Sequence, residues 1–152
     1  MLTEARTYKP ELLPRRGEIV AWILTGLGWL GVILLVSFGV TWYWAILFPT
    51  LLLLSALSIS FGNWMDRHTV LQLDQAGVAF ENGVRRVRFQ WGEIVEVQVI
   101  PAVWGETIHV VGQSAHFRFN TLGEVKYQGE VRGRTGFAQG RDIFQTILKM
   151  SG

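Results

Sequence analysis

The sequence predicts an α+β membrane protein, in which a two-helix transmembrane hairpin is followed by a small antiparallel β-barrel or sandwich with a C-terminal helix. Two observations lead to this fold class. From Ile19 to Met65 the chain contains no Asp, Glu, Lys or Arg, and this run is long enough for two membrane-spanning helices of about 20 residues each. After Arg67 the apolar residues follow a period of two, which is typical of β-strands, and a helical period returns near the end of the chain.

The composition excludes several classes of protein. Apolar residues make up 49% of the 152 residues, which is high for a soluble chain of this size and agrees with a membrane protein. There is no Cys, so disulfide bonds and thiolate chemistry are excluded. The net charge of +2 is too small to indicate a nucleic-acid-binding protein.

The two membrane spans are predicted at residues 19–38 and 43–62, and together they form a hairpin over residues 19–62. A short uncharged break, Gly39-Val40-Thr41-Trp42, separates them. A cleaved signal peptide does not explain the apolar run, because the apolar region of a signal extends over only about 7–15 residues. We therefore expect the hairpin to be an integral anchor in the lipid bilayer.

Aromatic residues and positive charges predict the orientation of the hairpin. Trp42, Tyr43 and Trp44 lie at the break between the spans. Trp22 and Trp64 lie at the opposite ends, so aromatic rings would line both membrane interfaces. The positive charges that flank the spans all lie away from the break: Arg6, Lys9, Arg15, Arg16 and Arg67. The positive-inside rule therefore predicts a multi-pass protein of the inner or plasma membrane, with both termini in the cytoplasm.

Small residues in both spans would allow the helices to approach closely. In the first span these residues are Gly28 and Gly31. In the second span they are Ser55, Ser58 and Gly62. Two interpretations stay open: the small residues pack the two helices of one hairpin together, or they form a face through which two chains associate.

Three glycines of the first span match the spacing found in dinucleotide-binding proteins. Gly26, Gly28 and Gly31 form G-x-G-x-x-G, a motif that works only between a strand and a helix, with an acidic residue about 20 positions later. The next acidic residue after Gly31 is Asp66, and the residues between them are uncharged. The match therefore does not indicate a nucleotide site, and no cofactor is predicted.

The second half of the chain, residues 66–152, is predicted to form a cytoplasmic β-domain. Its expected strands cover residues 70–74, 78–81, 84–90, 94–99, 107–111 and 115–119. Asn82-Gly83, between the second and third of these strands, is a strong hairpin signal. Short antiparallel strands of this kind are typical of a small barrel or sandwich.

The end of the β-domain is less regular. Residues 121–135 contain several glycines and scattered charges, and we expect them to be a loop with one short strand around residues 125–127. From about Phe137 the pattern is that of an amphipathic helix, with Ile143 and Ile147 on its apolar face. This helix is expected to close the β-domain.

In this order of elements the chain resembles small bacterial membrane proteins that carry a pleckstrin-homology-like domain behind two transmembrane helices. The resemblance covers about residues 15–150. It is carried by the strand pair Val70–Asp74 and Gly77–Glu81, by the stretch Phe89-Gln-Trp91-Gly-Glu93-Ile94, and by the final helix at residues 142–149. The family implies a membrane-tethered binding or scaffolding module without catalytic residues.

The chain departs from the eukaryotic members that bind phosphoinositides. Those domains place basic residues around their first strand pair. Here the corresponding turn is Asp74-Gln75-Ala76-Gly77, which contains no Lys or Arg. Phosphoinositide recognition is therefore not expected.

Polar residues of the β-domain offer few combinations for chemistry. His109 and His116 are expected to pair across a hairpin, with Glu106 as the nearby further ligand, whereas a zinc site needs three or four ligands. Ser114, a His and Asp142 lack the local motif of a nucleophilic triad. The sequence therefore predicts no catalytic residue, no metal site and no enzyme.

Arg85, Arg86 and Arg88 lie on one predicted strand and are the candidate contact site for anionic lipid headgroups or a protein partner. If these arginines face the bilayer, each gains about 1 kcal/mol from anionic headgroups. The alternative is an ordinary solvated sheet face on which Glu residues neutralise them. Nearby, Glu93 is expected to cap a turn or to meet an Arg.

These parts favour a non-enzymatic, membrane-anchored interaction or scaffolding module. A cytoplasmic segment, residues 1–18, would precede the hairpin, and the β-domain would bind a protein partner of unknown identity at the membrane. The alternative is an accessory structural subunit of a larger membrane protein complex, which would contact its partners through the transmembrane hairpin.

Overall fold

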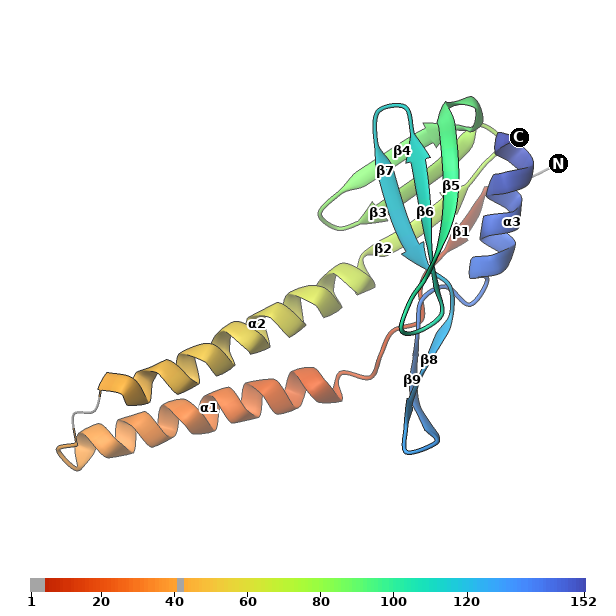
Figure 1. Cartoon of the computed structure of the whole chain (residues 1–152). Coiled ribbons are helices and arrows are strands. Elements are labelled where there is room, and N and C mark those ends of the chain that lie inside the picture. The colour runs from red at the N-terminus through yellow and green to blue at the C-terminus, as the bar shows by residue number, and fades with distance from the viewer. Residues whose placement is uncertain (1–4, 41–42) are drawn as a thin grey trace. The chain divides into compact units, whose positions relative to one another are not determined.

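The structure, a computed structural model, describes residues 5–40 and 43–152 (Figure 1). Its contacts divide the chain into two units. Pro14–Trp64 forms one unit, which we call the helical unit. The chain up to Leu13 and from Met65 onward forms the other, which we call the β-unit. The β-unit therefore combines residues from before and after the helices.

The helical unit consists of two long antiparallel helices that lie side by side (Figure 1). The elements are α1 (Arg16–Ser37), the 3₁₀-helix η1 (Tyr43–Ile46) and α2 (Leu47–Arg67), whose last residues belong to the β-unit. Both helices are long and apolar enough to cross a membrane, as the charge-free run predicts. The second one continues to Arg67, beyond its predicted end at Gly62. Trp42 of the predicted aromatic belt lies outside the described residues.

Gly28 is the small residue that brings α1 and α2 together. A Cβ added there would lie 3.1 Å from the Cβ of Pro49. Pro49 falls in the first turn of α2, where helix N–H groups lack helical partners, so the proline interrupts nothing. A Cβ added at Gly31 or Gly62 would meet no atom within 4 Å. Close packing of the hairpin therefore uses Gly28, and it does not use the other two glycines.

Three antiparallel sheets make up the strand structure of the described part of the β-unit. The first contains, in spatial order, β1 (Arg6–Tyr8), β2 (Thr69–Leu73), β3 (Gly77–Asn82) and β4 (Arg86–Gln90). The second contains β5 (Ile94–Pro101), β6 (Glu106–Gly112) and β7 (His116–Asn120). The third is a hairpin of β8 (Gly123–Tyr127) and β9 (Glu130–Thr135), and the helix α3 (Gly140–Ser151) follows it.

Strand alternation decides which side chains the sheets bury. In β4, Val87 and Phe89 are buried, whereas Arg86, Arg88 and Gln90 are exposed. The same alternation recurs in β7. Because successive side chains of a strand point to opposite faces, β4 and β7 each present one apolar face to the core and one polar face to solvent.

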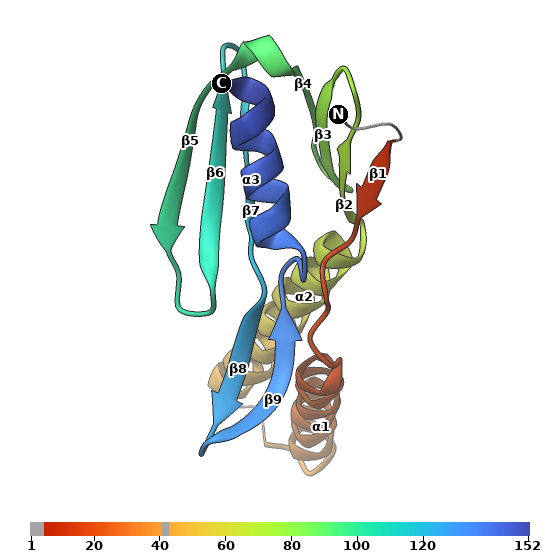
Figure 2. The same ribbon diagram turned by 90° about the vertical axis from the view of Figure 1, so that its right-hand side faces the viewer.

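The first two sheets and α3 share a single core. Phe80 of β3 stacks on Phe117 of β7, with 5.1 Å between the ring centroids. Ile143 and Ile147 of α3 are fully buried in the same cluster as Phe137. In Figure 2, α3 stands between the strands of the first sheet and those of the second. The predicted amphipathic helix thus fills the opening that the two sheets leave.

The sheets do not close into a barrel, which corrects one of the two predicted forms. β4 and β5 are joined by the 3₁₀-helix η2 (Trp91–Glu93) and do not pair with each other. The carboxylate of Glu93 accepts a hydrogen bond from the N–H of Gln90 at 2.8 Å, as the capping prediction expects. The indole N–H of Trp91 donates to the carbonyl oxygens of Asp74 and Gln75. These bonds turn the chain away from the first sheet, so β5 begins a second one.

Two parts of the β-unit differ from the sequence expectation. Residues 121–135 form the β8–β9 hairpin instead of a loop with one strand. Gln128 and Gly129 both have positive φ, as in a two-residue hairpin turn. The hairpin was not predicted because Gln-Gly is a weaker hairpin signal than Asn-Gly. The second difference is β1, where Arg6 and Tyr8 pair with Leu73 and Leu71 of β2.

Candidate functional site

The three candidate arginines do not form one cationic face. Arg86 and Arg88 project from the outer face of β4, at a shallow depression of about 230 Å³. Arg86 is 2.6 Å from the carboxylate of Glu81, and Arg88 is 3.1 Å from that of Asp74. Each of these two arginines is therefore paired with a neighbouring carboxylate.

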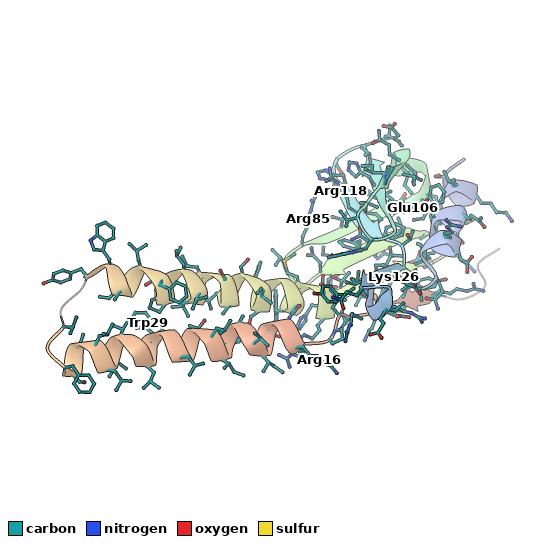
Figure 3. All side chains as sticks on the ribbon, turned by 60° about the horizontal axis from the view of Figure 1, so that its bottom comes forward. Arg16, Trp29, Arg85, Glu106, Arg118 and Lys126 are labelled. Carbon is teal, nitrogen blue, oxygen red and sulfur yellow. The ribbon has the colours of Figure 1, made fainter. Side chains whose placement is uncertain are left out.

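Arg85 differs from its two neighbours because it lies in the β3–β4 turn (Figure 3). Its backbone N–H donates to the Oδ1 of Asn82 at 2.9 Å, which holds the turn. No ion pair joins its guanidinium to another residue of the described chain. Of the three candidates, Arg85 is thus the one whose charge is free to meet an external anion.

The two histidines are neighbours, but not in the register that the sequence predicts. His109 lies opposite Arg118, and His116 lies opposite Val111. The imidazoles therefore meet diagonally, edge to face, with 5.3 Å between the ring centroids. The N–H of Gly112 donates to the carbonyl of Ala115 at 2.9 Å, so the two-residue turn is Gln113-Ser114, one position later than the prediction requires, and this shifts the pairing. Among the described residues, no group of three His, Cys, Asp or Glu side chains is arranged to hold a metal ion.

The imidazole of His109 is the more perturbed of the two. Its Nε2 is buried and has no hydrogen-bond partner in the described chain. Desolvation lowers the pKa of His109, and the nearby charges of Arg118 and His116 lower it further. Glu96 opposes this shift. The lowered pKa favours the neutral form of His109, which suits packing on the sheet.

A cavity of about 290 Å³ opens in the β-unit beside the aromatic core. Phe80, Phe119 and Phe137 contribute its apolar lining. Its polar lining comes from Glu11, Asp66, Thr69, Asn82, Thr107, Arg118, Asn120 and Thr135. The mixed lining could hold a small polar group over aromatic rings. Sequence reasoning missed this cavity because its walls come from several strands that are far apart in the chain.

A second missed feature is a polar cluster inside the helical unit. Glu18 of α1 is buried, and its carboxylate accepts hydrogen bonds from the hydroxyl of Ser60 (2.9 Å) and the amide of Asn63 (3.0 Å) on α2. Arg15 donates to the same carboxylate at 3.1 Å. The indole N–H of Trp22 donates to the Oγ of Ser60. The cluster therefore ties α1 to α2. The spacing of Ser60 and Asn63, three residues apart in an apolar helix, is the signal that could have found it.

Comparison with known proteins gives no match, whether with family models, with curated proteins or with solved structures. The resemblance to pleckstrin-homology-like proteins therefore stays a prediction. Its coarser content agrees with the structure, in which two helices able to cross a membrane precede small antiparallel sheets and a C-terminal helix.

Proposed function

We propose that this protein is a membrane-anchored, non-enzymatic interaction module, which presents a pleckstrin-homology-like β-unit on the cytoplasmic side of the cell membrane. One observation carries the proposal. In the most apolar stretch of the first helix only 6% of the residues are buried within the chain, and in that of the second helix 11% are buried. Exposing a large apolar side chain to water costs about 1.5–3 kcal/mol, so a surface of this kind requires lipid or a partner.

The proposed topology has both termini in the cytoplasm and the α1–α2 connection outside. It is supported by the position of the flanking Arg and Lys residues, which precede α1, begin it or follow the apolar part of α2. The chain contains no Cys, so single cysteines can report each side of the membrane.

Labelling of intact cells with a membrane-impermeant maleimide tests this topology. Val40→Cys, near the connection, is expected to react from outside. Val103→Cys, at a 90% exposed side chain in the β5–β6 loop, is expected to react only after the cells are opened. Labelling of Val103→Cys in intact cells would overturn the orientation. Recovery of the chain in the soluble fraction would overturn the anchor itself.

The β-unit is proposed to carry the binding function, because it has its own core and therefore a rigid surface. The ligand is proposed to be another protein, and Arg85 is the residue proposed to reach anionic headgroups. Crosslinking with mass spectrometry in native membranes would identify what the β-unit touches. Crosslinks that fall only on the helices would count against the module.

An accessory subunit of a larger membrane complex is the second candidate. It is favoured by Gly31 and Gly62, which the hairpin leaves open and which allow another helix to approach closely. Exchange of the hairpin for an unrelated one separates the two functions. If partner capture survives the exchange, the β-unit binds the partner. If capture is lost while the chain still reaches the membrane, the helices bind it.

A further inference from the structure

The outer edge of β5 is the feature of the β-unit that the proposed function leaves unused. β5 pairs with β6 on one side and ends the second sheet on the other, as Figure 2 shows. Within the described chain, no backbone hydrogen bond reaches the outer edge of its eight residues. A free edge of this length presents a row of unpaired N–H and C=O groups that can pair with another strand.

β5 is the longest of the edge strands in the first two sheets. β1 has only three residues, β4 has five with two arginines, and β7 has five with one arginine. Short length and edge charges are the usual protections of an open sheet. In β5 the one charged side chain is Glu96, whereas Val95, Val99 and Ile100 are 66%, 44% and 39% exposed. An apolar edge of this kind needs a cover.

The sequence of β5 indicates what covers it. Residues 94–100 read Ile-Val-Glu-Val-Gln-Val-Ile, which is the same in both directions except that a carboxylate replaces an amide. Two antiparallel copies related by a twofold axis at Val97 would place Glu96 opposite Gln98. We propose that β5 pairs with β5 of a second copy of this chain, and that the two second sheets join into one continuous sheet across the dimer.

The chemistry of the facing residues supports this register. Within one chain the amide of Gln98 already donates to the carboxylate of Glu96 at 2.9 Å, so the two groups lie on one face of the strand and suit each other. Across the twofold axis each Glu96 meets a Gln98, and no like charges meet. A bulge between Ile94 and Glu96 twists the start of the strand. Val95 is the extra residue of this bulge, so the pairing is centred on residues 96–98, which follow the bulge in regular register.

Charge variants of the full chain test the register. Gln98→Glu places two Glu–Glu contacts in the dimer, and the dissociation constant, measured by sedimentation in detergent, is expected to rise about tenfold or more. Adding Glu96→Lys to Gln98→Glu converts both contacts to Lys–Glu and is expected to restore the wild-type constant. If the double variant dissociates as readily as Gln98→Glu, this register is wrong. A wild-type chain that is monomeric throughout overturns the dimer.

Cysteine crosslinking tests the twofold axis independently, in the same full chain. Residues directly opposite in an antiparallel pair have Cα atoms about 4.5–5.5 Å apart, which a disulfide spans. Val97→Cys is expected to form a disulfide-linked dimer in the membrane. The matched control is Arg118→Cys on β7, which is expected to remain monomeric. Equal crosslinking of both variants, or none of Val97→Cys, overturns the proposal. Hydrogen-exchange protection of β6 shows that each variant is folded.

Discussion

The β-unit and the helix α1 of the helical unit bury opposite kinds of side chain. In the β-unit the fully buried residues are apolar, as with Leu71 and Ile143, and charged side chains cover the surface. In α1 the buried residues are the polar Glu18 and Thr25, while Leu, Ile and Val side chains face outward. The same apolar preference is at work in both units. The outcome differs because the β-unit must hide apolar groups from water, whereas the membrane position proposed for the helices requires polar groups to be hidden from lipid.

Among the variants considered, truncation of a buried ring in the β-unit is expected to lower stability most. Truncation of an exposed apolar side chain in α1 is expected to change stability very little. Phe137 is 2% exposed, so Phe137→Ala is expected to destabilise the β-unit by about 3–5 kcal/mol. Leu27 of α1 is 58% exposed, and Leu27→Ala in a bilayer is expected to stay within about 0.5 kcal/mol. Hydrogen exchange in the full chain reports the first variant at the β6 amides and the second at the α1 amides. A large loss from Leu27→Ala would mean that α1 packs on protein and not on lipid.

The next largest loss of stability is expected from overpacking the core of the β-unit. A Cβ at Gly112 would overlap the ring of Phe89, so Gly112→Ala is expected to cost about 1–3 kcal/mol. Gly92→Ala is the matched control, since a Cβ there meets no atom within 4 Å. The same exchange measurement compares them, and equal protection in the two variants would contradict the tight contact.

Loss of the polar cluster is expected to destabilise the packing of α1 on α2 and to leave the stability of the β-unit unchanged. Glu18→Ala leaves the hydroxyl of Ser60 and the amide of Asn63 without this acceptor, and the expected cost to the hairpin is about 1–3 kcal/mol. Dyes on Leu30→Cys and Leu54→Cys report helix separation by energy transfer during titration with a denaturing detergent. Ile23→Ala is the control, because Ile23 is exposed. An unchanged midpoint for Glu18→Ala would show that the cluster does not hold the helices together.

The smallest effect is expected from pH, and it should be confined to the β-unit. The pKa of His109 is lowered in the folded chain, so the unfolded chain binds more protons as the pH falls below the ordinary histidine value of about 6.5. The β-unit is therefore expected to lose stability on acidification from neutral pH, and His109→Asn is expected to reduce that loss. A pH profile that His109→Asn leaves unchanged would assign the effect to another group.

Local pattern was enough to predict the helices, most strands and α3. The charge-free run after Glu18 predicts two spans because their requirement is composition and length. Ile143 and Ile147 predict the buried face of α3 because they are four residues apart, and residues at this spacing lie on the same side of a helix. The capping role of Glu93 was also predictable, since donor and acceptor are only three residues apart.

What the sequence alone could not determine depends on residues that are distant along the chain. Arg6–Tyr8 has no strand pattern of its own and becomes β1 because β2 offers a free edge. The opening between the sheets results from the η2 turn, and the pairing of Arg86 and Arg88 with carboxylates results from strand register. In the sequence, Glu18 only marks the start of the charge-free run. Its hydrogen bonds depend on Ser60 and Asn63 of α2, which are more than 40 residues away along the chain. Periodicity is a property of neighbouring residues, whereas these contacts exist only once the tertiary structure has brought separate segments together.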